Sequence, residues 1–168
     1  MEFKTSFDWY AKTVIGFVTI LFLGIIAFYV VKLVQAPNAL PLMIPFLFSS
    51  VLLILIYVIC YLYRPLKYVI EGGKLIIKRP LKDKFINLSD IKDVYAIKKD
   101  SMGWVMKTFG NGGLFGFYGE FRSDRYGHMT WYATRKSNYV MLESSEGRIV
   151  LTPDNLEMIG EIKKLIRP

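Results

Sequence analysis

Glycine and aromatic residues alternate from 109 to 121, and such a run is where a phosphate-binding loop would be sought. A P-loop requires G-x-x-x-x-G-K-[ST], but no glycine of this run is followed directly by Lys and then Ser or Thr. A dinucleotide fingerprint requires G-x-G-x-x-G between a strand and a helix, whereas the next element here is predicted as a strand. Such glycines permit sharp bends and close strand approach, while the aromatic side chains fill a core. We therefore predict a structural motif made of Gly110, Gly112, Gly113, Phe115, Gly116, Phe117, Gly119 and Phe121.

Residue types suited to catalysis or metal binding are sparse. His128 is the only histidine, and Cys60, the only cysteine, lies inside a long apolar segment. No set of His, Cys and carboxylates has the spacing of metal ligands, and no base stands in a motif beside a nucleophile. A histidine on a strand beside Tyr126 and Met129 is expected at the surface or in packing. We predict no catalytic residue, no metal and no cofactor, with a lipid hydrolase or transferase kept as an outside alternative.

A series of basic side chains is the best candidate for a binding function. It follows the second apolar segment, and each cation near an anionic membrane surface gains about 1 kcal/mol. The tendency of Lys and Arg to stay on the cytoplasmic side would enrich the same residues without lipid specificity, so both explanations stay open. Nucleic acid is not expected, because the aromatic residues lie in the glycine run and not on a stacking platform. The candidate head-group residues are Lys74, Lys78, Arg79, Lys82 and Lys84.

Two long apolar segments precede the basic series. Residues 14–31 and 39–63 contain no charged side chain. A helix needs about 20 apolar residues to cross a bilayer, where helices satisfy their own backbone hydrogen bonds. We therefore predict transmembrane helices over about 13–34 and 40–63, which make residues 1–63 a membrane hairpin. No ionisable residue lies at mid-membrane depth, which argues against a pump or channel.

The distribution of positive charge predicts the orientation of this hairpin. Lys4 and Lys12 precede the first segment and Arg64 follows the second, while the intervening loop has only Lys32 at its edge. Positive residues near span ends stay inside, which predicts two cytoplasmic termini in the inner membrane of a bacterial cell. A rival reading makes the first segment a signal peptide, because Val34-Gln35-Ala36 resembles a cleavage site. In either case the polar part of the chain would be cytoplasmic.

The polar part, residues 64–168, is predicted to consist of strands followed by one helix. Short β-rich runs over 66–71 and 74–79 are joined by Gly72-Gly73, a strong hairpin signal. Further runs at a spacing of about 8–12 residues give seven or eight strands, which is typical of a small sandwich or barrel. Thr152-Pro153-Asp154 predicts a helix start, and apolar residues then recur at helical spacing. The assignment between residues 98 and 109 stays open between strand and loop.

The glycine and aromatic run also resembles the signature of bacterial pleckstrin-homology-like (bacterial PH) domains. The later pieces Tyr132-Ala133-Thr134, Asn138-Tyr139-Val140 and Thr152-Pro153-Asp154 follow in the order of that family. The resemblance covers about residues 64–168, and a membrane hairpin before such a domain is common. It implies a mainly β fold, a seven-stranded half-barrel of two nearly orthogonal sheets capped by a C-terminal helix. It implies no enzyme activity, and it supplies no ligand residues.

Together these observations predict a non-enzymatic, membrane-anchored binding or scaffolding module. One mechanism is docking of the PH-like domain on anionic lipid head groups at the cytoplasmic surface. The alternative is an assembly surface for a protein partner or for self-association in the membrane. The basic series favours the first mechanism, and the missing catalytic groups are compatible with both.

Overall fold

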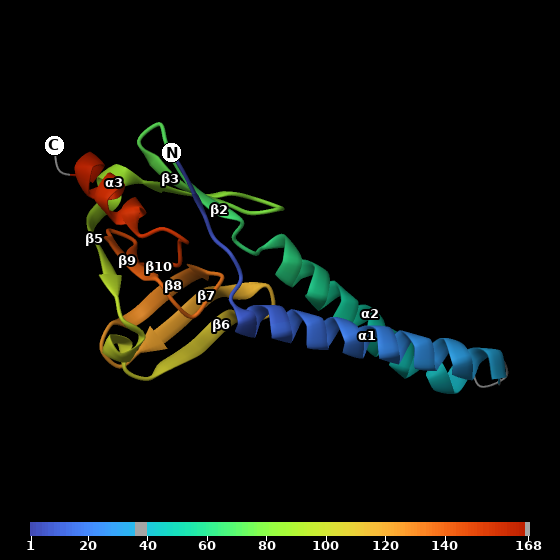
Figure 1. Ribbon diagram of the computed structural model, residues 1–168. Helices are drawn as coiled ribbons and strands as arrows, with labels where there is room; N and C mark the ends of the chain where they lie inside the picture. The colour runs from blue at the N-terminus through green and yellow to red at the C-terminus, as the bar shows by residue number, and fades with distance from the viewer. Residues whose placement is uncertain (36–39, 167–168) are drawn as a thin grey trace.

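Two long helices project from one side of a strand-rich domain in the computed structural model, which describes residues 1–35 and 40–166 (Figure 1). Helix α1 (Trp9–Gln35) and helix α2 (Leu40–Leu62) cover the two predicted spans, and both are long and apolar enough to cross a membrane. At 1.5 Å per residue α1 is about 40 Å long, which exceeds a hydrocarbon core of about 30 Å. The loop residues Pro37 and Asn38, and Ala36 of the suggested cleavage site, lie outside the described residues.

The two helices lie side by side (Figure 1), and polar and aromatic side chains join them. Thr19 Oγ1 lies 2.8 Å from the hydroxyl oxygen of Tyr57, and the ring centroids of Phe22 and Tyr57 are 5.6 Å apart. Tyr29 and Phe46 make a second aromatic contact at 5.7 Å. A hydrogen bond between side chains is favourable inside a bilayer, where water cannot replace it, so these contacts fix how the helices face each other.

The first sheet has four antiparallel strands in the order β1 (Glu2–Lys4), β2 (Lys67–Glu71), β3 (Lys74–Lys78) and β4 (Lys84–Asn87). Gly72 and Gly73 join β2 to β3 with φ values of 57° and 71°, as the hairpin signal predicts. Strand β1 was not predicted, because it comes from the residues before α1. It pairs with β2, and the ammonium group of Met1 donates to the Ile70 carbonyl at 2.8 Å.

The second sheet has six strands in the order β5-β9-β10-β8-β7-β6. β8 and β10 run parallel, and the other neighbours are antiparallel. The strands are β5 (Ile91–Ile97), β6 (Val105–Gly113), β7 (Gly116–Ser123), β8 (Gly127–Ala133), β9 (Tyr139–Ser144) and β10 (Gly147–Leu151), with short 3₁₀ helices η2 (Leu88–Asp90) and η3 (Lys99–Met102) before β5 and β6. Residues 66–166 thus contain nine strands, more than the predicted seven or eight, because β6 also forms and begins within the stretch 98–109 whose assignment stayed open.

Helix α3 (Glu157–Ile166) follows the strands and covers one core, so the predicted order of strands and then one helix is confirmed. Met158 and Ile162 of α3 are fully buried. The predicted helix start at Thr152 is wrong: the hydroxyl of Thr152 is buried and accepts a hydrogen bond from the Thr134 amide at 2.9 Å. Asn155 Oδ1 instead accepts from the Glu157 amide at 2.9 Å, which satisfies a free N–H group of the first turn.

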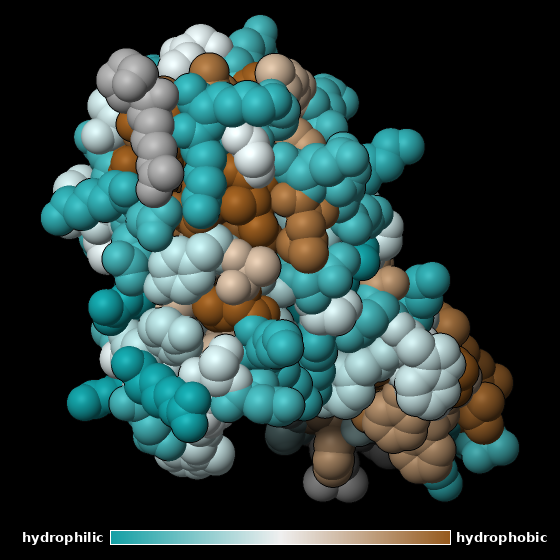
Figure 2. Space-filling model, turned by 60° about the vertical axis from the view of Figure 1, so that its left-hand side comes forward, coloured by the Kyte–Doolittle hydropathy of each residue, from teal (hydrophilic) through white to brown (hydrophobic). Residues whose placement is uncertain are grey.

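Two clusters of buried side chains hold the domain together. One joins the first sheet to α3 and to strands β9 and β10, and includes Tyr68, Leu75 and Ile162. The other lies on the second sheet around Phe121, Trp131 and Met141. Outside these cores the visible face of the domain is mostly hydrophilic, and hydrophobic residues gather where the helices leave it, at the lower right of Figure 2. The domain therefore has its own cores, and the helices carry the exposed apolar surface.

Candidate functional site

The loop between β3 and β4, residues 79–83, lies against the end of α2. The amide of Leu81 donates to the carbonyl of Leu62, the last residue of α2, at 3.2 Å. The last four carbonyls of a helix have no partner within the helix, so this bond satisfies one of them. The Leu81 side chain is 56% exposed at the tip of the loop. The loop is thereby fixed at the point where the chain leaves the helix pair.

Three side chains give this β3–β4 loop a defined conformation. Arg79 Nε donates to the carbonyl of Lys82 at 2.6 Å, and the guanidinium lies over the rings of Tyr63 at 5.5 Å and Tyr132 at 5.8 Å. Asp83 accepts from Lys78 Nζ at 2.6 Å and from the Arg79 amide at 3.2 Å. The hydrogen bond from Lys78 lowers the pKa of the Asp83 carboxyl below its usual value. Arg79 and the exposed Lys82 therefore form the cationic surface of the loop, while Lys78 is paired with Asp83.

The structure brings together only part of the predicted basic series. Lys78, Arg79 and Lys82 lie at the β3–β4 loop. Lys74 lies at the other end of β3, about 13 Å along the strand, beside the β2–β3 turn. Lys84 begins β4, and its ammonium group is 3.5 Å from Glu146 in the β9–β10 turn. The loop is the part of the series that is next to the helix pair.

Aromatic and cationic residues also gather at the helix ends, where the sequence analysis used Arg64 only to predict orientation and did not single out Trp9. Arg64 follows α2 and lies half-buried among rings, 4.3 Å over Tyr61, 5.7 Å over Phe7 and 5.8 Å over Phe115. Trp9 opens α1 with its side chain 80% exposed. Trp and Tyr at the ends of membrane spans are typical of the boundary between lipid and water. The positions of these residues beside the apolar segments could therefore have indicated this boundary from the sequence.

The glycine and aromatic run forms the β6–β7 hairpin. Gly110 and Gly119 are paired across it with φ values of 108° and 112°, and a Cβ on either would come within 2.5 Å of a backbone oxygen. Gly116 has a φ of 118°, and its Cβ would lie 2.6 Å from the Ala133 carbonyl oxygen. Gly112 is different, because a Cβ there would meet only the side chain of Lys107. Close strand approach thus accounts for Gly110, Gly116 and Gly119, and Gly113 has a φ of 145° that favours glycine, so only Gly112 has no explanation in the hairpin.

The tip of the β6–β7 hairpin lies between the two helix ends. On one side Phe117 stacks on Tyr10 of α1, with ring centroids 6.3 Å apart. On the other side Phe115 packs edge-on against Tyr57 of α2 at 5.0 Å. Phe115 adopts a φ of 60°, a conformation that side chains other than glycine rarely take, and its ring is buried. The aromatic part of the motif therefore connects the domain to the helices.

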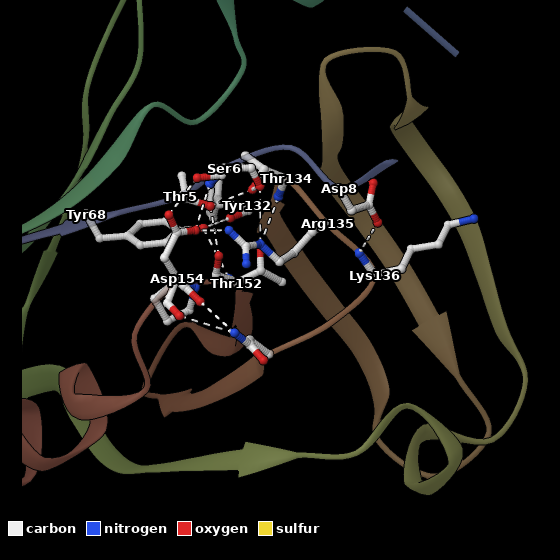
Figure 3. A network of polar contacts seen from close by, with 12 residues as sticks. Thr5, Ser6, Asp8, Tyr68, Tyr132, Thr134, Arg135, Lys136, Thr152 and Asp154 are labelled. Carbon is white, nitrogen blue, oxygen red and sulfur yellow. Dashed lines mark hydrogen bonds and ion pairs between the residues drawn. The ribbon is translucent and has the colours of Figure 1, made fainter. Parts of the chain in front are cut away.

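The segment before α1 is tied to the domain by a network of polar contacts (Figure 3). Asp154 accepts from the Ser6 amide at 2.8 Å and from the Ser6 hydroxyl at 2.6 Å, and it forms an ion pair with Arg135. Asp8 accepts from the Lys136 amide at 2.9 Å. Thr5 donates to the Thr152 carbonyl at 2.8 Å. Residues 1–8 thus form an N-terminal strap, which no local sequence pattern indicated.

His128 lies on β8 at the surface of the domain. Its Nε2 atom is 3.3 Å from a carboxylate oxygen of Glu120, and its side chain is 67% exposed. The contact is a surface pair across the β7–β8 ladder, where Arg122 faces His128 and Thr130 faces Glu120. This position agrees with the expectation of a surface or packed histidine.

Comparison with known proteins gives one match. Residues 66–165 match a family model described as "Bacterial PH domain". No curated protein matches the chain, and no solved structure matches it. The matched residues run from just before β2 to the last turn of α3 and include the β3–β4 loop, the β6–β7 hairpin and both cores. The chain belongs to the bacterial PH domain family.

Proposed function

We propose that this protein is a non-enzymatic, membrane-anchored binding module whose β3–β4 loop docks on anionic lipid head groups. The observation that carries the proposal is the hydrogen bond from the Leu81 amide to the Leu62 carbonyl. A helix that spans a bilayer ends near the head groups, so a loop bonded to its last residue is held at that depth. Arg79 and Lys82 are the cations that this loop offers.

The cations of the loop and its exposed leucine both favour binding to an anionic membrane surface. Each cation near an anionic surface contributes about 1 kcal/mol, and the attraction falls off within a Debye length of about 8 Å at physiological salt. Leu81 adds apolar surface at the tip, and burying a leucine side chain contributes about 1.5–3 kcal/mol. Apolar insertion combined with surface charge is how peripheral segments bind membranes. Because the helix pair already anchors the chain, docking needs only to orient the domain.

The N-terminal strap supports a topology with both termini on one side of the membrane. Strand β1 precedes α1 and pairs with β2, which follows α2, so both outer ends of the helix pair meet the same domain. The positive-inside rule, applied to Lys4, Lys12, Arg64 and Lys67, assigns that side to the cytoplasm of a bacterial cell. Anionic lipids of the cytoplasmic leaflet would then face the loop.

Lipid selectivity tests the proposal. The full chain is reconstituted in vesicles that mix neutral and anionic lipid. An amphipathic polymer then extracts the protein together with the lipid that surrounds it, and the fraction of anionic lipid in this extracted belt is measured. We expect the wild type to retain more anionic lipid than the vesicle average, and R79E/K82E to fall toward that average. The matched control is Lys74→Glu, which reverses an exposed lysine at the far end of β3. Equal anionic lipid in the wild type and R79E/K82E would contradict docking.

Self-association is a second candidate, favoured by the exposed edge of the second sheet. Among the described residues β6 pairs only with β7, and its outer edge carries Phe109 with a side chain that is 77% exposed. An unpaired edge strand can add a second strand from another chain. A cysteine at Phe109 in the Cys60→Ala background would crosslink two copies in membranes under this mechanism. Recovery of monomer alone would count against it.

A further inference from the structure

A groove of about 470 Å³ follows β6 on the face of the second core cluster, away from the β3–β4 loop. Its lining extends along β6 from Val105 to Gly112, about 23 Å of strand. Its floor is aromatic and consists of Phe117, Phe121, Trp131 and Tyr139. Phe121 and Trp131 are stacked with centroids 4.6 Å apart. The groove is thus long and apolar, and its volume is in the range of small-molecule sites, about 300–1,000 Å³.

Three lysines are the charged residues of the lining. Lys99 lies at the η3 end of the groove, Lys107 on β6 and Lys136 at the end next to α1. No Asp or Glu lines the groove, and none of the three ammonium groups forms an ion pair within residues 1–35 and 40–166. Lys136 Nζ instead lies 3.4 Å from the ring centroid of Tyr10. An aromatic floor beneath unpaired cations attracts a ligand that has an apolar body and an anionic group.

Two features of the lining have no explanation in the fold itself. Trp131 is 5% exposed, and its indole Nε1–H has no acceptor among the described residues. Buried donors of native proteins are almost always paired, so an unpaired donor beneath the groove is unusual. Gly112 needs no glycine conformation, and a side chain there would enter the space beside Lys107. Its missing side chain keeps this part of the groove open.

We propose that this groove binds a single-chain anionic amphiphile such as a fatty acid. The carboxylate would lie among the lysines, and the chain would lie along the aromatic floor. The elongated shape favours one chain, and the contacts of Phe117 and Lys136 with Tyr10 put one end of the groove at the start of α1, where a chain can arrive from the bilayer. Burial raises the pKa of Tyr139 to about 12, with a smaller contribution from Asp8, so its hydroxyl adds no negative charge at neutral pH. This site is independent of docking by the β3–β4 loop.

Tryptophan quenching tests the site in the full chain. Two of the three tryptophans, Trp104 and Trp131, line the groove, and Trp9→Phe removes the third. The W9F protein is placed in nanodiscs of neutral phosphatidylcholine, so that docking on anionic lipid plays no part. A terminally brominated undecanoate is the probe, because bromine quenches a tryptophan that it contacts. We expect saturable quenching, with the corresponding brominated undecanol binding at least about tenfold more weakly, the effect of one lost charge contact.

Groove variants and a matched control decide the outcome. K99A/K107A should weaken binding of the brominated undecanoate about tenfold or more, because charge contacts with its carboxylate are lost. Both lysines are exposed, so their removal should not disturb the core. Gly112→Leu should abolish saturable quenching by filling the space, and the circular dichroism spectrum reports whether that variant is folded. Lys92→Ala, at an exposed lysine of β5 outside the groove, should bind as the parent does. Quenching that only rises in proportion to the probe, or equal affinity for acid and alcohol, would overturn the proposal.

Discussion

The hydroxyl of Tyr118 on β7 donates to the backbone carbonyl of Cys60 in α2 at 2.6 Å. The amide of Arg64, the regular partner of that carbonyl, points instead to the Tyr61 carbonyl at 3.4 Å. A side chain of the domain therefore caps the last turn of the helix. Burial raises the pKa of Tyr118, so the hydroxyl keeps its proton and remains a donor at physiological pH. The domain and the helix pair are joined by a specific bond as well as by the chain.

Tyr118→Phe should loosen this junction. The Cys60 carbonyl loses its partner in a partly buried site, and a typical hydrogen bond contributes about 1 kcal/mol. We expect a destabilisation of that size in chemical unfolding, and a broader distribution of distances between spin labels on α2 and on β7. Tyr95→Phe is the matched control, since its hydroxyl bonds Glu143 at 2.9 Å, away from the helices. An unchanged distance distribution in Tyr118→Phe would contradict the capping role.

Gly119→Ala should destabilise the β6–β7 hairpin severely. The new Cβ would lie 2.5 Å from the Phe109 carbonyl oxygen and 2.8 Å from Gly110 Cα, and the φ of 112° is unfavourable for alanine. We expect a loss of about 2–3 kcal/mol or more, measured by denaturant unfolding. Gly160→Ala on α3 is the control, because its Cβ enters open space in a helix and should stabilise by about 0.5–1 kcal/mol. Equal stability of the two variants would show that the close approach of β6 and β7 does not require glycine at position 119.

Asp154→Asn should release the N-terminal strap. In the variant the acceptor of the hydrogen bonds from Ser6 is no longer charged, and the ion pair with Arg135 is lost. Hydrogen bonds to charged groups contribute about 1.5–3 kcal/mol. We expect faster proteolysis within residues 1–8 and a destabilisation of about 2 kcal/mol. Asp100→Asn changes an exposed carboxylate in η3 and should leave both measurements unchanged. Unaltered protection of the strap in Asp154→Asn would count against its role.

The ion pair of Lys78 with Asp83 predicts a pH dependence of stability. The pKa of Asp83 is lower in the folded protein than in the unfolded chain, so the pair stabilises above pH about 4 and this contribution is lost as pH falls through the folded pKa. Lys78 is more than a third exposed, so the effect should be below about 1 kcal/mol. The unfolding midpoints of wild type and Asp83→Asn should differ near neutral pH and converge below the folded pKa. A difference that persists in acid would arise from another cause.

The helices and the β2–β3 hairpin were predictable because their signals are local. Uncharged segments of this length form spanning helices, and Gly72-Gly73 forms a tight turn whatever surrounds it. Strand β1 was not predictable, because three residues alternating around Phe3 carry no strand signal until Ile70, 69 residues from Met1, supplies the hydrogen-bond partner. The start of α3 was misplaced because the Thr152 hydroxyl satisfies the Thr134 amide, a tertiary contact that overrides the capping pattern.

The candidate site was predictable only in composition. Counting lysines and arginines identified a basic segment after α2, but the segment spans a strand, a loop and the start of another strand. The hydrogen bond between Leu81 and Leu62 decides which cations lie next to the helix pair. Ion pairs with Asp83 and Glu146 then leave Lys78 and Lys84 less available for binding. The groove along β6 could not be predicted from the sequence either. Its lysines come from η3, β6 and the β8–β9 connection, and only the fold of the second sheet brings them together.

The depth of residue 81 in a bilayer tests the docking loop most directly. Leu81→Cys and Lys74→Cys, each in the Cys60→Ala background, are spin-labelled in full-length protein in anionic and in neutral bilayers. Accessibility to oxygen and to a water-soluble nickel complex then gives the depth of each label. The label at 81 should lie among the head groups of the anionic bilayer and move outward at high salt, while the label at 74 stays in water throughout. A label at 81 as water-exposed as the label at 74 in every bilayer would contradict docking.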